Sequence, residues 1–285
     1  MKSKVKLSPL LSLVCSLWMI PASLSGQDIA MTERIADNFM REGYYYTAAK
    51  YYSRVYFFSP KEDLGKISGK LGKAYFAKGD FQRAYKHLEQ AQKLERNDSL
   101  KTEWFLQKTA ALALQHKYKL ALLEILNYRG KFTATQKRKL HFIKGTVYFG
   151  EEKFDRAKAD FQLALKKNDS IALKQLDKLF SKKNIMRPNP KVAMWLSIIT
   201  PGLGQVYAGD IKNGINSFLL NGTLFYLFVR DAMHFTFFES FIVFYPWIQR
   251  YYQGGFERAE KIAEERRKQK RAHTYQNIHE LIWSD

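Results

Sequence analysis

Cysteine is almost absent from this chain of 285 residues, with Cys15 as the only one. One cysteine cannot close a disulfide within the chain or build a zinc site from several thiolates. The six histidines show no metal-ligand spacing, and the sequence contains neither a phosphate-binding loop nor a nucleophile elbow. We therefore predict no cofactor, no metal and no catalytic residues, and a protein that is not an enzyme. An active site built on a lone serine or carboxylate is the open alternative.

Acidic residues are also scarce. The chain has 27 Asp and Glu against 47 Lys and Arg, which gives a net charge of +20. In a cytosolic protein such an excess would favour nucleic acid as the partner. In an exported protein it favours anionic lipid headgroups, acidic envelope polymers or an acidic protein. Because the start of the chain favours export, we predict no nucleic-acid partner.

The first 25 residues have the order of a secretory signal. Lys2, Lys4 and Lys6 precede the apolar run Leu10–Ile20, and small residues follow up to Ser25. An uncleaved anchor is the alternative, although the apolar run is short for a membrane span. Either form would place the rest of the chain outside the cytoplasm.

A periodic pattern occupies the first half of the chain. An aromatic residue precedes an alanine by three positions at Tyr45/Ala48, Phe81/Ala84, Tyr118/Ala121 and Phe154/Ala157. The alanines lie at intervals of 36, 37 and 36 residues. Small and bulky apolar residues precede each alanine at fixed distances, which places them on one face of each of two consecutive helices. A fixed period of this length predicts a repeat array.

The pattern resembles the tetratricopeptide repeat over roughly residues 29–170. The fullest copy is Gly145-x-x-Tyr148-x(5)-Phe154-x-x-Ala157-x(3)-Phe161-x-x-Ala164. Glycines Gly43 and Gly79 mark the turn within the first two repeats, whereas His116 and Glu152 hold that place in the others. The resemblance implies an all-α solenoid of helical hairpins that binds proteins. With a capping helix after residue 170, the array would cover residues 29–183; an unrelated stack of α-hairpins is the alternative.

The resemblance also implies which side chains face the partner-binding groove. The candidates are Asp37, Arg41, Lys73, Phe76, Phe142, Thr146 and Phe149. Chaperone-binding repeats carry Lys and Asn where this chain has Glu33 and Asp37. Capture of a C-terminal carboxylate is therefore disfavoured, and the partner remains unnamed.

The composition changes after a linker at residues 184–190. Three aromatic-rich apolar stretches follow, at about residues 192–208, 215–229 and 232–248. Each is near or below the length of a transmembrane helix. We predict a small α-helical transmembrane module over residues 191–250, with three crossings if the tail stays cytoplasmic and two if it does not. The basic tail, residues 251–285, is predicted to be an amphipathic helix after a break at Gly254-Gly255.

A Pro-Gly motif begins in the first apolar stretch and extends beyond it. Its residues are Pro201, Gly202, Gly204, Gln205, Tyr207, Gly209 and Gly214. It resembles a short Pro-Gly-x-Gly-Gln-x-Tyr-x-Gly module of bacterial envelope proteins and, distantly, the TM2 domain, although the histidine and the Arg-Phe pair of TM2 are missing. Gln205 at membrane depth would need a polar partner. Glu239 is the ionisable side chain of the third stretch that we single out as a functional candidate.

Together these features predict an exported, non-enzymatic scaffold of the bacterial inner membrane or cell envelope. Its periplasmic repeat array would bind protein partners, and its C-terminal module would contact membrane lipid. The main alternative is a small membrane transport, insertion or sensing module with the repeats as an accessory. A third possibility is a soluble periplasmic repeat protein whose apolar half packs as an ordinary helical domain.

Overall fold

The computed structural model of the chain describes residues 28–166, 169–234 and 236–283. The predicted signal, residues 1–25, lies outside them. Within the described residues all regular secondary structure is α-helical, which confirms the predicted all-α class. The chain divides into two compact units, residues 1–151 and 152–285. Each unit is described by itself.

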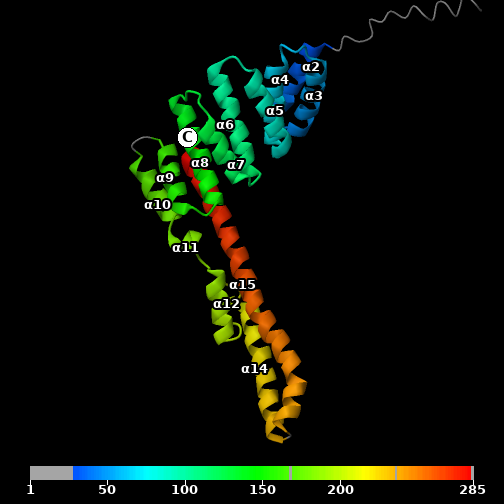
Figure 1. The fold of residues 1–285 in the computed structure, drawn as a ribbon, viewed down its shortest axis with the longest axis vertical. Coiled ribbons are helices and arrows are strands. Elements are labelled where there is room, and N and C mark those ends of the chain that lie inside the picture. Colours follow the sequence, from blue (N-terminus) through cyan, green and yellow to red (C-terminus); the bar gives the residue numbers. More distant parts are fainter. Residues whose placement is uncertain (1–27, 167–168, 235, 284–285) are drawn as a thin grey trace, which may run out of the picture. The chain divides into compact units, whose positions relative to one another are not determined.

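The first unit is a stack of helices that pack on one another in chain order (Figure 1). The helices are α2 (Ile29–Arg41), α3 (Tyr45–Phe58), α4 (Leu64–Ala77), α5 (Phe81–Leu94), α6 (Asp98–Leu114), α7 (Tyr118–Asn127) and α8 (Ala134–Gly150). In addition, α6 packs against α8. The pairs α2–α3, α4–α5 and α6–α7 match the first three predicted repeats, so the unit is solenoid-like.

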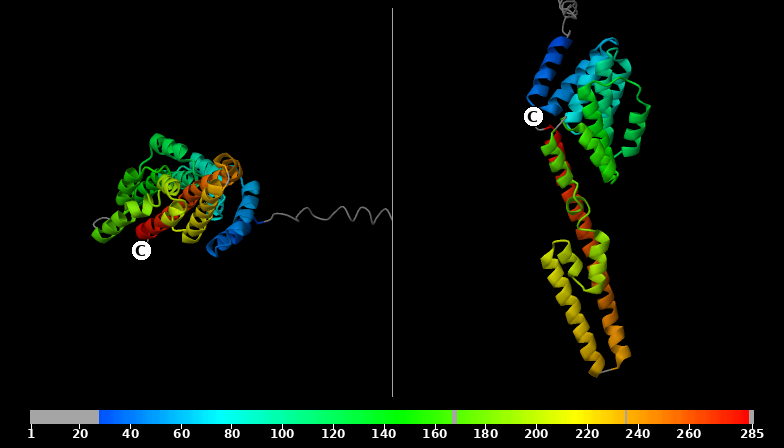
Figure 2. Two further views of the ribbon diagram at one scale, coloured as in Figure 1. Left: turned by 90° about the horizontal axis from the view of Figure 1, so that it is seen from below. Right: turned by 90° about the vertical axis from the view of Figure 1, so that its left-hand side faces the viewer.

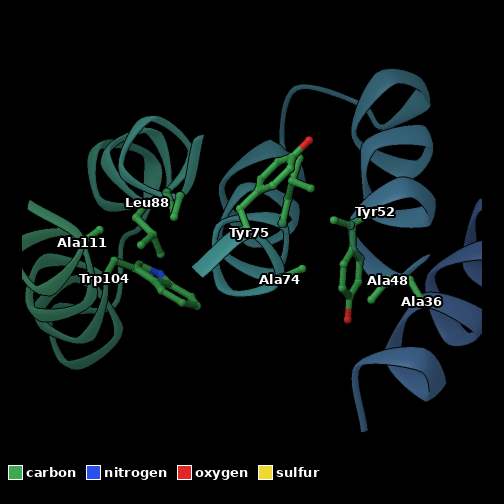
Figure 3. Packing of buried hydrophobic residues seen from close by; sticks show 12 residues of the cluster. Ala36, Ala48, Tyr52, Ala74, Tyr75, Leu88, Trp104 and Ala111 are labelled. Carbon is green, nitrogen blue, oxygen red and sulfur yellow. The ribbon is translucent and has the colours of Figure 1, made fainter. Parts of the chain in front are cut away.

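Small residues let neighbouring helices of this stack approach closely (Figure 3). Ala36, Ala48 and Ala84 are completely buried. A Cβ added to Gly72 would lie 2.8 Å from Leu88 Cγ on the next helix. Trp104 of α6 covers Gly69 of α4 in the same way, because a Cβ there would lie 2.6 Å from Trp104 Cζ2. The repeat therefore needs its small residues for packing.

The turn inside each repeat has the same backbone conformation in all four copies. Gly43 and Gly79 have φ angles of 81° and 86°, and His116 and Glu152 have 58° and 61°. All four are left-handed, a conformation that favours glycine and that is uncommon for other residues. The turns of repeats three and four, which the sequence signalled weakly, thus keep the geometry without the glycine.

The second unit is built around one long helix. It contains α9 (Phe154–Ala164), α10 (Ser170–Leu179), α11 (Lys182–Ile185), α12 (Pro190–Ile199), α13 (Leu203–Tyr207), α14 (Ile211–His234) and α15 (Phe237–Trp283). The long helix α15 packs against α10, α11, α12, α13 and α14. Helix α14 and the first part of α15 form an antiparallel hairpin, drawn in yellow and orange in Figures 1 and 2.

The three predicted membrane spans are not found. Among the described residues, no helix combines the length and the apolar content needed to cross a membrane. The first stretch is divided between α12 and α13, because the chain leaves helical conformation at Thr200 and turns at Gly202, where φ is 94°. The second lies in α14, whose apolar residues are interrupted by Asn216 and Asn221. The third begins in the last turn of α14 and continues in the first turns of α15.

The predicted break at Gly254-Gly255 is wrong as well. Helix α15 runs without interruption through both glycines and through Pro246. The tail is helical as predicted, and one of its faces carries Ala259 and Ala263, which are fully buried. That face packs on Ala193 and Ala208 of the same unit. At the glycines themselves, the Gln205 side chain of α13 donates to the Gly255 carbonyl at 2.8 Å.

Candidate functional site

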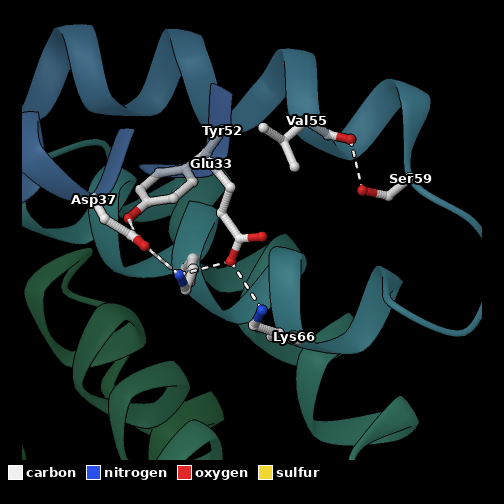
Figure 4. A network of polar contacts seen from close by, with 7 residues as sticks. Glu33, Asp37, Tyr52, Val55, Ser59 and Lys66 are labelled. Carbon is white, nitrogen blue, oxygen red and sulfur yellow. Dashed lines mark hydrogen bonds and ion pairs between the residues drawn. The ribbon is translucent and has the colours of Figure 1, made fainter. Parts of the chain in front are cut away.

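Ion pairs between consecutive repeats occupy the first helices of the stack (Figure 4). Lys70 of α4 contacts Glu33 and Asp37 of α2, with Nζ–oxygen distances of 2.7 Å to each side chain. Lys66 adds a 3.0 Å contact to Glu33, and the Tyr52 hydroxyl donates to Asp37 at 2.5 Å. The predicted groove residue Asp37 is therefore part of a contact that joins two repeats.

The electrostatics of this cluster follow from its half-buried position. Burial acts to raise the pKa of Glu33 and of Asp37. The hydrogen bonds from Lys70, with those from Lys66 to Glu33 and from Tyr52 to Asp37 and the charges of both lysines, together outweigh burial and lower both pKa values. Burial acts to lower the pKa of Lys70, and its bonds to the two carboxylates reverse that and raise it. Burial and the bond to Asp37 raise the pKa of Tyr52. All three charges are thus held in their ionised forms at neutral pH.

The other predicted groove residues differ in their exposure. Lys73 is exposed, and its Nζ lies 4.8 Å from the centroid of the Trp104 ring. Arg41 is exposed beside Asn38, to which its guanidinium donates. Phe76 is half-buried against Phe81, with ring centroids 5.4 Å apart. Lys73 and Arg41 are thus the accessible members of this part of the set.

The last three candidates lie together on α8. Phe142, Thr146 and Phe149 are all half-buried, and the Thr146 hydroxyl donates to the Phe142 carbonyl at 3.0 Å. The sequence did not point to Trp104 or Lys70. The contact between Lys73 of α4 and Trp104 of α6 joins two repeats, so the pattern within a single repeat does not reveal it.

The Pro-Gly motif forms a compact polar turn in the second unit. The buried Gln205 side chain accepts from Ser197 Oγ at 2.9 Å and donates to the Gly255 carbonyl at 2.8 Å. Ser197 Oγ in turn accepts from the Gly204 amide at 3.0 Å. The predicted need of Gln205 for a polar partner is met, and its amide links α12, α13 and α15.

The glycines of the motif permit close backbone contacts. A Cβ on Gly204 would lie 1.8 Å from the Ala193 carbonyl oxygen, and one on Gly202 would lie 2.1 Å from the Gly214 carbonyl oxygen. Gly209 has a φ of 92° and no atom near its missing Cβ, so it serves the turn. Tyr207 accepts from the Asn189 amide at 3.1 Å. The motif is therefore an architectural element that orients the start of α14.

Glu239 lies in the first turn of α15, where it is exposed. Its Oε2 accepts from the Thr236 amide at 3.4 Å, as a carboxylate at a helix N-terminus does. Glu239 is thus not an ionisable group buried in an apolar environment. Its position favours a role in starting α15.

Two cavities of the second unit carry positive charge. One, of about 380 Å³, lies between α14 and α15 and is lined by Arg250 and Arg258 together with several amides. The other, of about 530 Å³, lies beside Tyr207 and Gly209. Its cationic lining residues are Lys182, Lys183, Arg187, Arg266 and Lys270. Such basic clusters attract anionic groups.

Comparison with known proteins supports one part of this description. The sequence profile of the tetratricopeptide repeat matches residues 66–98. This segment begins in α4 and ends in α6, so it contains the whole of α5 and most of the second predicted repeat. No curated protein and no solved structure matches the chain. The TM2-like resemblance of the second half gains no support from this match, which lies outside that half.

Proposed function

We propose that the chain is a membrane-associated scaffold of the bacterial cell envelope, whose repeat array binds a protein partner. A tetratricopeptide repeat within a helical array is typical of protein–protein interaction modules, and such repeats usually carry no chemistry. This supports a scaffold rather than an enzyme. Export through the predicted signal and a periplasmic position of the array belong to the proposal.

The proposed membrane association rests on the apolar surface of the α14–α15 hairpin. Phe225, Phe237 and Phe238 are 63%, 64% and 67% exposed. Exposed apolar side chains continue along both helices at Ile215, Phe218, Leu219, Met233, Phe241, Ile242, Val243 and Trp247. Soluble proteins rarely expose so much apolar surface on one element, because each such side chain costs free energy in water.

A hairpin of this kind fits a position in the interfacial layer of a bilayer. An interfacial helix buries its apolar residues among acyl chains and keeps polar groups at the headgroups, and it does not need the apolar length of a span. The two basic cavities add attraction to anionic headgroups. We therefore place the hairpin in the membrane without requiring it to cross.

Vesicle flotation tests the membrane part. The wild-type chain is expected to float with phospholipid vesicles, and the double variant Phe225→Asp/Phe238→Asp to remain in the soluble fraction. Phe57→Asp is the matched control, since Phe57 is 78% exposed on α3 of the first unit. Equal flotation of all three proteins would show that the hairpin is not the part of the chain that contacts the membrane. If the wild type stays in the soluble fraction and self-associates through the hairpin, the partner of the apolar surface is a second copy of the chain and not lipid.

The protein-binding part is tested by photo-crosslinking in cells of the native host. A photoreactive residue at Lys73 is expected to give one defined adduct, because this side chain is exposed beside Trp104. The same group at Lys50, which is exposed on α3, is the control. Identical adducts from both positions would show that the first helices of the repeats do not form the binding face.

The compartment is tested separately with alkaline phosphatase, which is active only outside the cytoplasm, fused after residue 285. An active fusion supports export with the C-terminus outside. A second fusion after residue 166 reports on the repeat array alone. Two inactive fusions that are both expressed would contradict export.

A further inference from the structure

We propose that the cavity between α14 and α15 binds the phosphate group of an anionic phospholipid. The proposal rests on the membrane association proposed above. The cavity is lined by Gln205, Asn213, Asn216, Asn221, Arg250 and Arg258, among others. Arg250, Gly254 and Arg258 lie four residues apart on α15 and so share one face of that helix.

Gly254 provides the space between the two arginines. A Cβ at this position would meet no atom within 4 Å, whereas a Cβ at the neighbouring Gly255 would lie 3.2 Å from Ser217 Oγ of α14. The two helices are therefore close at Gly255 and leave an opening at Gly254. The opening has a volume of about 380 Å³, which is ample for a phosphate group with its glycerol.

The charge of the cavity favours an anion. No acidic side chain is among its lining residues in the described part of the chain. Neither Arg250 nor Arg258 forms an ion pair or hydrogen bond with any described residue. Asp210 caps α14 through Asn213 and lies within electrostatic range of Arg258 without pairing with it. Two guanidinium groups without a paired carboxylate can bind phosphate oxygens. Each guanidinium can donate two parallel N–H groups to them.

The position of the cavity selects a lipid phosphate over a free one. The exposed apolar residues of α15 end at Trp247, and Arg250 follows within one turn. On the other helix, Leu220 belongs both to the cavity lining and to the exposed apolar surface. Tyr251 lines the cavity too, and tyrosine is frequent at the level of headgroups. A phospholipid bound here would have its phosphate between the arginines and its acyl chains along the hairpin.

The test is binding of the full chain to vesicles of phosphatidylcholine alone and to vesicles with one third phosphatidylglycerol. The measured quantity is the ratio of the two partition coefficients. Arg250→Gln and Arg258→Gln are each expected to lower this ratio by clearly more than about fivefold, because one basic residue near an anionic surface is already worth about a factor of five and each arginine also loses its bonds to the phosphate. Gly254→Leu, which fills the cavity and keeps every charge, is expected to lower the ratio by more than about twofold, whereas Gly254→Ala is expected to leave it within about twofold.

Lys212→Gln is the control for diffuse attraction. Lys212 is an exposed cation beside Asn213 at the same level of the hairpin, and it does not line the cavity. Its substitution is expected to lower the ratio by no more than about fivefold, which is the effect of diffuse attraction alone. A loss equal to that of the arginine variants, or an unchanged ratio in Gly254→Leu, would overturn the headgroup site. So would displacement of the wild type from anionic vesicles by soluble glycerol phosphate at the same phosphate concentration.

The outcomes separate this site from the proposed function. Failure of the wild type to bind either kind of vesicle would contradict membrane association itself. Binding to both kinds, with a ratio that none of the cavity variants alters, would leave membrane association in place and remove the headgroup site. Circular dichroism of each variant shows whether its helices are intact.

Discussion

Lys70 is the residue on which the contact between the first two repeats depends most. It bonds to two carboxylates that would otherwise repel each other at close range. We predict that Lys70→Met lowers the free energy of unfolding at pH 7 by about 1–2 kcal/mol, which lies between the costs of breaking an exposed and a fully buried ion pair. Urea denaturation of the variant and the wild type measures this difference. Lys50→Met, at an exposed lysine, is expected to cost less than about 0.5 kcal/mol.

The effect of Lys70→Met should depend on pH in a defined direction. The pKa values of Glu33 and Asp37 are lowered in the fold, so their contribution is present above the ordinary carboxyl pKa and is lost as the pH falls through the lowered values. The raised pKa of Lys70 keeps its contribution throughout the neutral range. The difference in stability between the variant and the wild type should therefore shrink as the pH falls below the ordinary carboxyl pKa values. A difference that stays constant from pH 7 to pH 3 would contradict the ion-pair account.

Gly79 and His116 allow a reciprocal test of the left-handed turn. Gly79→Ala adds a Cβ to a residue with a φ of 86° and should destabilise the first unit by about 1 kcal/mol. His116→Gly removes the Cβ from a residue with the same left-handed conformation and should stabilise the first unit by about 0.5 kcal/mol. The gain is smaller than the loss at Gly79 because glycine loses more conformational entropy on folding. Thermal unfolding of both variants measures this. Shifts of the same sign would show that backbone strain is not what distinguishes the two turns.

At the scale of elements, substitutions of Gly204 and Gly222 distinguish the effect of close helix packing from that of helix propensity. Gly204→Ala would drive a Cβ against the Ala193 carbonyl and should destabilise the second unit by about 3 kcal/mol or more. Gly222 lies within α14 with nothing within 4 Å of its missing Cβ, so Gly222→Ala should stabilise the helix by about 0.5–1 kcal/mol. Chemical denaturation followed by circular dichroism compares them. Similar losses for both would contradict the close contact between α12 and α13.

Elements formed by short-range patterns were predictable, and those fixed by distant contacts were not. The aromatic-x-x-Ala spacing predicted the helix pairs from α2 to α7 because each repeat carries its own small and bulky residues. The Pro-Gly motif indicated a polar partner for Gln205 but not which one, since the Gly255 carbonyl lies 50 residues away. Gly254-Gly255 predicted a break, but α15 continues through both glycines, and the Gly255 carbonyl accepts from Gln205. The apolar content of α14 and α15 indicated spans, although asparagines in α14 and early charges in α15 limit that content.

At the scale of the whole molecule, the two units differ in the side chains that they expose. In the first unit, half-buried ion pairs join the repeats, and Lys73 and Arg41 are left exposed on its first helices. In the second, exposed aromatic residues follow the hairpin, and cations line two cavities near its base. This division supports one surface for a protein and another for lipid.

The contact of the hairpin with lipid is tested most directly by an environment-sensitive fluorophore. Cys15→Ser leaves no other thiol, so a single nitrobenzoxadiazole label can be placed at Phe225→Cys of α14 or, as the control, at Phe58→Cys of α3. Both phenylalanines are exposed, at 63% and 56%. On addition of anionic vesicles, the label at position 225 should brighten and shift to shorter wavelength, and the label at position 58 should not change. An unchanged signal at position 225, or equal changes at both positions, would contradict membrane association through the hairpin.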